Sequence, residues 1–121
     1  MAKMTRDEVE VAINLADHPK FKWACGMKTA CGTRIKAGWV MDKWLKAFDP
    51  EEAPVPDLND PATRGCLLEI VRKLGKDDTA YVSSFEEGWS VVVWPEPNVI
   101  VYKATEGLAL ADFIISQSRY I

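Results

Sequence analysis

One histidine and three cysteines are the side chains of this sequence that are most able to do chemistry. His18 stands seven residues before Cys25; the other two thiols are Cys31 and Cys66. A structural zinc site needs about four ligands, and its cysteines usually come in pairs about two to four residues apart. The sequence has no such pair. We therefore expect no metal and no cofactor, and we interpret the thiols as small, mostly apolar side chains.

A catalytic thiol would need a base within hydrogen-bonding reach, and His18 is the one imidazole in the sequence. The sequence contains no phosphate-binding glycine loop, no G-x-S-x-G motif and no H-E-x-x-H motif. Its acidic pairs lie in expected loops, where solvation is their ordinary explanation: Glu51-Glu52, Asp77-Asp78 and Glu86-Glu87. We therefore expect that the protein is not an enzyme. A Cys25/His18 or carboxylate site is the least favoured hypothesis.

Basic and aromatic side chains alternate between residues 20 and 46, where seven cations accompany a single acid, Asp42. Cations can neutralise phosphates while aromatic rings stack on bases, and tryptophan is also frequent at protein–protein hot spots. We expect Trp23 and Trp89 to anchor the core. Trp39 and Trp44 lie beside a proline-rich stretch with fewer core partners. The predicted binding residues are Trp39, Trp44, Lys36, Lys43 and Arg34.

The charge of the chain decides between two kinds of partner. The net charge is −3, but residues 1–48 carry +4 and residues 49–121 carry −7. The acidic second half would repel the phosphates that the basic stretch could attract. A protein partner is therefore our first hypothesis, and a nucleic-acid-binding accessory protein that uses residues 20–46 is the alternative.

Three helices are predicted from local signals. Thr5 and Glu8 have the spacing of a capping box, which predicts a helix over about residues 6–17. Asp60 followed by Pro61 predicts a second helix start, and Gly75 is expected to end that helix. Thr105 is expected to cap a third helix near the end of the chain.

The other segments give weaker patterns. Residues 26–40 resemble two short strands around a Cys31-Gly32 turn, and residues 39–48 could form one or two helical turns. The stretch of about residues 49–59, with three prolines, is expected to be a linker that buries little. Three β-rich runs lie near residues 79–85, 89–94 and 99–103.

These elements predict an α+β fold: a two-layer sandwich in which three helices pack on a small antiparallel sheet, with a late three-stranded meander and a short early hairpin. At 121 residues, we expect a single domain over residues 1–121. We find no apolar run of about 20 residues and no secretory signal, and the odd cysteine count favours reduced thiols, so we expect a soluble cytoplasmic protein without membrane contact. It is expected to be a monomer or a homodimer paired through a sheet edge such as Val99 to Tyr102.

Four fragments together resemble uncharacterised small proteins encoded by tailed phages and prophages. They are Gly26-Met27, GTRI at 32–35, PDLNDPATRGCLLEIVRK at 56–73 and Gly88-Trp89, and the segment of the form PDLxDPATxGCLL is the most specific. The resemblance brings no known activity and no functional residue. It implies a non-structural accessory protein that acts in the cytoplasm of a bacterial host cell, with a host or phage protein as its partner.

Overall fold

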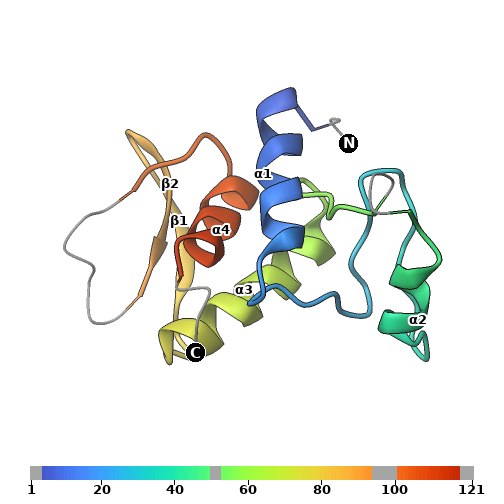
Figure 1. Ribbon diagram of the computed structural model, residues 1–121. Helices are drawn as coiled ribbons and strands as arrows, with labels where there is room; N and C mark the ends of the chain where they lie inside the picture. Colours follow the sequence, from blue (N-terminus) through green and yellow to red (C-terminus); the bar gives the residue numbers. More distant parts are fainter. Residues whose placement is uncertain (1–3, 50–52, 94–100, 118–121) are drawn as a thin grey trace.

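The computed structural model describes residues 4–49, 53–93 and 101–117 of the chain. Within these ranges it contains four helices and one two-stranded antiparallel sheet (Figure 1). In chain order these are α1 (Arg6–Asp17), α2 (Met41–Lys46), α3 (Pro61–Gly75), β1 (Tyr81–Phe85), β2 (Gly88–Val92) and α4 (Glu106–Ile115). The fold is therefore α+β, as predicted.

Helix α1 begins and ends where its sequence predicts. The Glu8 N–H donates to the Thr5 hydroxyl at 3.2 Å, and the Thr5 N–H donates to the Glu8 carboxylate at 3.0 Å. This reciprocal capping box satisfies two N–H groups that helix geometry leaves without partners. The buried face of α1 includes Ala12 and Leu15.

Helix α3 starts as predicted and ends one residue later than predicted. The Asp60 carboxylate accepts the Thr63 N–H at 3.0 Å, and Pro61 occupies the first turn. Gly75 is still helical, and the left-handed position that ends the helix is taken by Lys76, whose φ is 52°. The expected stop at Gly75 is therefore wrong by one residue. A Cβ atom at Gly75 would make an ordinary van der Waals contact with Val93 at 3.5 Å.

Helix α4 is the central element of the described chain. Thr105 caps it by accepting the Leu108 N–H at 3.2 Å, as predicted. The helix packs against α1, α3 and both strands. Its second residue, Gly107, lies against the carbonyl of Leu58, so closely that a Cβ atom there would overlap that oxygen. The segment before α3 and the start of α4 therefore pack backbone to backbone.

The sheet is a hairpin with Tyr81 opposite Val92 and Phe85 opposite Gly88. Gly88 has a φ of 136°, and a Cβ atom there would lie 2.6 Å from the carbonyl oxygen of Lys103. Lys103 also forms an isolated antiparallel bridge with Trp89. The predicted third strand, near residues 99–103, and the predicted dimer edge at Val99 to Tyr102 lie partly outside the described residues.

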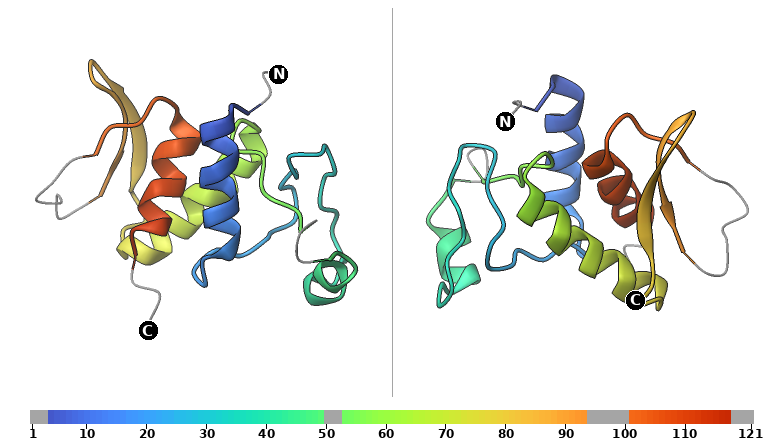
Figure 2. Two further views of the ribbon diagram at one scale, coloured as in Figure 1. Left: turned by 45° about the horizontal axis from the view of Figure 1, so that its top comes forward. Right: turned by 180° about the vertical axis from the view of Figure 1, so that it is seen from behind.

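The layers differ from the prediction of three helices on one sheet. Figure 1 shows α4 between α1 and the hairpin, and the view from behind in Figure 2 shows α3 crossing the other two helices. Helix α1 packs on α4, and α4 makes the main helix contact with the sheet. Helix α2 and the segment before it lie at the opposite end of the molecule from the sheet (Figures 1 and 2).

The early hairpin and the linker also differ from their predictions. Around the Cys31-Gly32 turn the strands reduce to a single bridge between Lys28 and Arg34. Backbone bonds still join the two sides of this turn, since the Ile35 N–H donates to the Met27 carbonyl and the Thr29 N–H to the Thr33 carbonyl, each at 2.8 Å. The Ala30 N–H instead donates to the Val55 carbonyl at 2.8 Å. Residues 50–52 of the expected linker lie outside the described residues, but its end is core: Pro56, Leu58 and Asp60 are fully or almost fully buried.

Candidate functional site

Four aromatic rings connect helix α2 to the rest of the protein. Trp44 packs against Trp23 with ring centroids 5.5 Å apart, and Trp23 packs against buried Phe21 at 5.3 Å. Trp44 also contacts Trp39 at 5.8 Å. These edge-to-face and tilted geometries are the favourable ones for aromatic pairs. We call Phe21, Trp23, Trp39 and Trp44 the aromatic cluster.

The aromatic cluster explains why a helix of six residues forms here. Helix α2 has no side chain capping its start, and an isolated helix of this length is unstable in water. Trp23, Trp39 and Trp44 are partly buried and pack against the main core. The predicted binding residues Trp39 and Trp44 are therefore brought together, and Trp44 is the centre of their packing.

Two apolar side chains beside these rings are exposed to solvent. Val40 is 65% exposed, and Phe48, whose ring packs edge-to-face against Trp44 with centroids 5.5 Å apart, is 37% exposed. The same short stretch of the chain, residues 36–48, also carries three exposed lysines: Lys36, Lys43 and Lys46. We call Val40, Phe48, Trp39 and these three lysines the α2 patch. The patch contains two of the predicted cations, Lys36 and Lys43.

The fifth predicted binding residue, Arg34, forms an ion pair with another part of the same chain. Its guanidinium makes a bidentate ion pair with Asp60, with Nη1–Oδ2 at 2.8 Å and Nη2–Oδ1 at 2.9 Å. Nη1 also donates to the Gly26 carbonyl at 2.8 Å. The Asp60 side chain is 2% exposed and that of Arg34 is 44% exposed. Arg34 therefore fastens the early segment to the start of α3.

The electrostatics of this pair follow from its partners. Burial by itself would raise the pKa of Asp60, but hydrogen bonds from Arg34 and from the backbone and hydroxyl of Thr63 outweigh burial and lower it. The hydrogen bond to Asp60 raises the pKa of the Arg34 guanidinium above its usual value. Both groups are charged at neutral pH, and the carboxylate is saturated by donors from two segments.

His18 has a structural position and does not face a thiol. It is 2% exposed, its Nδ1 accepts the Lys20 N–H at 3.1 Å, and its Nε2 lies 3.1 Å from the Gln117 carbonyl. A nitrogen that accepts from N–H carries no proton, so the neutral ring donates from Nε2. The ring ties the end of α1 to the end of α4. Both ring nitrogens are occupied, which argues against His18 as the base for Cys25.

The three thiols have different surroundings. Cys25 and Cys31 are exposed, and Cys66 on α3 is partly buried. The Thr29 hydroxyl lies 3.0 Å from Cys31 Sγ and lowers the pKa of that thiol against a smaller opposing effect of burial. Burial raises the pKa of Cys66, and the nearby Cys25 adds to the rise.

Several carboxylates of the described chain take part in turns, caps and ion pairs. Asp77 accepts the backbone N–H and the hydroxyl of Thr79, at 2.9 Å and 2.6 Å, within one turn. Glu86 and Glu87 are exposed at the hairpin turn, and both residues of the pair Glu51-Glu52 lie outside the described residues. Among the described residues, no three His, Cys, Asp or Glu side chains gather closely enough to hold a metal ion.

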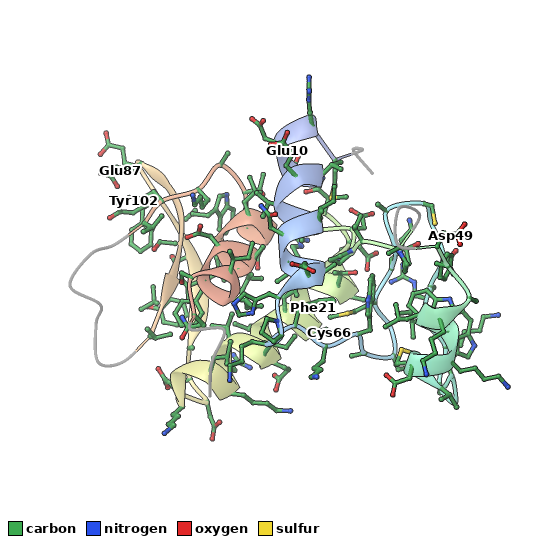
Figure 3. All side chains as sticks on the ribbon, in the orientation of Figure 1. Glu10, Phe21, Asp49, Cys66, Glu87 and Tyr102 are labelled. Atoms are coloured by element: carbon green, nitrogen blue, oxygen red, sulfur yellow. The ribbon has the colours of Figure 1, made fainter. Side chains whose placement is uncertain are left out.

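A second exposed apolar area lies on the sheet. Three side chains in this area are 44–51% exposed: Tyr81, Phe85 and Val101. The Phe85 ring packs edge-to-face against Tyr102, with centroids 5.7 Å apart. Figure 3 shows Tyr102 and Glu87 at this end of the molecule and Asp49 at the other end, beside α2. Acidic rather than basic side chains, Glu86 and Glu87, accompany the sheet area.

A hollow of about 520 Å³ lies between α1 and the segment that follows α2. Val9, Ile13 and Ala16 line it from the helix, and Val55 lines it from the opposite segment. Two polar side chains, Asn14 and Asp17, complete the helical side. Among the described residues that line the hollow, Asp17 is the one titratable side chain.

Sequence reasoning missed the two exposed residues of the α2 patch, Val40 and Phe48. A signal for Phe48 existed, because it stands four residues after Trp44, and this spacing places both on one side of a helical turn. Val40 carried no such signal. Its exposure depends on where the chain turns into α2, just after Gly38 with a φ of 87°.

Comparisons with models of protein families, with curated proteins and with solved structures gave no match. Within the described part of the chain, none of the helices has both the length and the apolar character that crossing a bilayer requires.

Proposed function

We propose that this protein is a small non-enzymatic accessory protein that binds another protein through the α2 patch. The observation that carries the proposal is the exposure of two apolar side chains: Val40, at the start of α2, and Phe48, whose ring packs against Trp44 of the aromatic cluster. Exposed apolar groups gain free energy when a partner covers them. Apolar anchors at the centre and polar groups at the rim are the usual anatomy of protein interfaces.

The charge around the anchors supports an acidic partner surface. Lys36, Lys43 and Lys46 are exposed, and Asp42 is the only acidic residue within α2. Cations at the rim of an interface increase the association rate with an acidic partner and disfavour basic ones. The resemblance to small phage-encoded proteins supports a host or phage protein as partner, in the cytoplasm of a bacterial cell.

Photo-crosslinking in the bacterial cytoplasm tests this proposal. A photoreactive amino acid replaces Val40 in one variant and Ile13 in the control; Ile13 is also exposed, at 51%, but lies on α1. We expect a discrete protein adduct from position 40 that is lost when Lys36, Lys43 and Lys46 are changed to Glu. No adduct from position 40, or the same adduct from both positions, would reject the α2 patch as the binding surface.

Nucleic-acid binding is the second candidate, because four exposed lysines adjoin the aromatic rings: Lys22, Lys36, Lys43 and Lys46. The packing of the rings argues against it, since Trp44 already contacts three other rings and has less face to offer a base. Fluorescence anisotropy with a single-stranded oligonucleotide distinguishes nucleic-acid binding from protein binding as the function. Affinity that falls steeply between about 50 and 200 mM salt would favour nucleic acid; no binding at low salt would exclude it.

A further inference from the structure

Two contacts hold residues 25–28 along the first two turns of α3. The Lys28 N–H donates to the Thr63 hydroxyl at 2.9 Å, and Cys66 Sγ lies 3.9 Å from the Cys25 carbonyl oxygen. Thr63 and Cys66 are three residues apart on one face of the helix. Lys28 and Cys25 are also three residues apart. Matching spacings therefore place Cys25 opposite Cys66.

The Cys66 sulfur atom lies beside the backbone of Cys25. A carbonyl oxygen lies about 2.4 Å from the Cα of its own residue. With the 3.9 Å contact, this puts Cys66 Sγ at most about 6.3 Å from the Cα of Cys25. This bound joins a sulfur to a Cα, and the two Cα atoms can lie farther apart by the length of the Cys66 side chain. Because a disulfide requires Cα atoms about 4.4–6.8 Å apart, its formation requires rotation of both side chains and a shift of residues 25–28 towards α3 wherever the Cα separation exceeds that range. The effect of Cys25 on the pKa of Cys66 is a second sign that the thiols are close.

Both thiols can be reached from solvent, because Cys25 is exposed and Cys66 is only partly buried. We propose that Cys25 and Cys66 form a reversible intramolecular disulfide that locks residues 24–28 onto helix α3. The existing ties at this place, the Arg34–Asp60 pair and the Lys28–Thr63 bond, are non-covalent. The disulfide would add a covalent tie that responds to the redox state of the surroundings.

The oxidant in this proposal is a small disulfide of the glutathione class. The exposed Cys25 thiolate attacks one sulfur of oxidised glutathione, forms a mixed disulfide and releases one glutathione thiolate. The Cys66 thiolate then attacks the Cys25 sulfur, forms the protein disulfide and releases the second glutathione thiolate. Each protein thiol gives up one proton, and the two electrons lost by the protein reduce the oxidised glutathione to two molecules of reduced glutathione.

Mass spectrometry of the intact chain in glutathione buffers of increasing oxidised fraction tests the proposal. The Cys31→Ser variant is used, because the exposed Cys31 thiol would otherwise compete. We expect a product that has lost two hydrogen atoms, carries no glutathione and returns to the starting mass with reductant. Trypsin releases the two cysteines on separate peptides, Trp23–Lys28 and Gly65–Arg72. The disulfide is therefore detected as these two peptides joined in one species.

The Cys31→Ser/Cys66→Ser variant is the matched control and is expected to stop at the glutathione adduct of Cys25. Three results would overturn the proposal: a stable glutathione adduct on Cys25 while Cys66 stays free, a disulfide between two chains, or no reaction at either thiol. In the wild-type chain, linkage of Trp23–Lys28 to the Cys31 peptide, Thr29–Arg34, in place of the α3 peptide would also overturn it.

Discussion

Asp60 accepts hydrogen bonds from two parts of the chain that are distant in sequence. It caps α3 through the Thr63 N–H and hydroxyl, and it holds both terminal nitrogens of Arg34. A buried carboxylate is stable only when such donors replace water. The sequence marked Asp60 correctly as a helix cap. It could not reveal the second role, because Arg34 lies 26 residues away.

The first prediction concerns the charge of Asp60. Asp60→Asn keeps an oxygen for the Thr63 N–H but removes the ion pair, so we expect the free energy of unfolding to fall by about 1–3 kcal/mol. Urea unfolding followed by circular dichroism measures it. Asp78→Asn, at an exposed turn position, is the control and should change stability by less than about 0.5 kcal/mol. Equal effects of the two substitutions would contradict the role of Asp60.

The second prediction is the pH dependence of the same carboxylate. Because the folded protein lowers the pKa of Asp60, the folded state holds its proton less tightly than the unfolded chain does. The stabilisation is therefore complete above the unfolded pKa of about 3.9 and is lost as the pH falls through the lower folded pKa. Unfolding at several pH values between about 5 and 2 should give a steeper loss for wild type than for Asp60→Asn. Parallel curves would be evidence against this linkage.

At the scale of elements, the separation in sequence between hydrogen-bonded residues explains which structural predictions succeeded. The caps of α1, α3 and α4 each join residues three positions apart, so the sequence contains them in full. The prediction of a linker that buries little was wrong, and the early hairpin is present only as a single bridge with a few backbone bonds across its turn. Other backbone groups of these segments bond to distant residues. The Lys28 N–H, for example, bonds to Thr63, 35 residues away.

The close approach of α4 to the segment before α3 gives the third prediction. Gly107→Ala would place a Cβ against the Leu58 carbonyl, so we expect a loss of about 3 kcal/mol in unfolding free energy. Gly65→Ala on the open face of α3 is the matched control. Nothing lies within 4 Å of its added Cβ, so we expect a gain of about 0.5–1 kcal/mol. Thermal unfolding should therefore shift in opposite directions, and shifts of the same sign would contradict the packing.

The aromatic cluster gives the fourth prediction. Trp44 contacts three rings and Trp39 contacts one, so Trp44→Ala should destabilise the protein by about 2–4 kcal/mol and Trp39→Ala by clearly less. Near-ultraviolet circular dichroism should lose most of its aromatic signal in the Trp44 variant only. If both variants behave alike, Trp44 is not the centre of the cluster.

At the scale of the molecule, the two exposed apolar areas differ in charge. The α2 patch is rimmed by lysines, and the sheet area at the other end carries Glu86 and Glu87 (Figure 3). This division reflects the excess of positive charge in residues 1–48 and of negative charge in the rest. An acidic partner would therefore be steered toward the α2 end. The sequence alone indicated the basic region, whereas the exposed anchors depend on tertiary packing.

The affinity of the cross-linked partner for two variants tests the central claim most directly. Val40→Asp places a negative charge in the α2 patch, and Ile13→Asp places the same charge at a similarly exposed site on α1. Isothermal titration should give a Kd at least about tenfold higher for Val40→Asp, with unchanged unfolding free energy, and a wild-type Kd for Ile13→Asp. A wild-type Kd for Val40→Asp would contradict binding through the α2 patch.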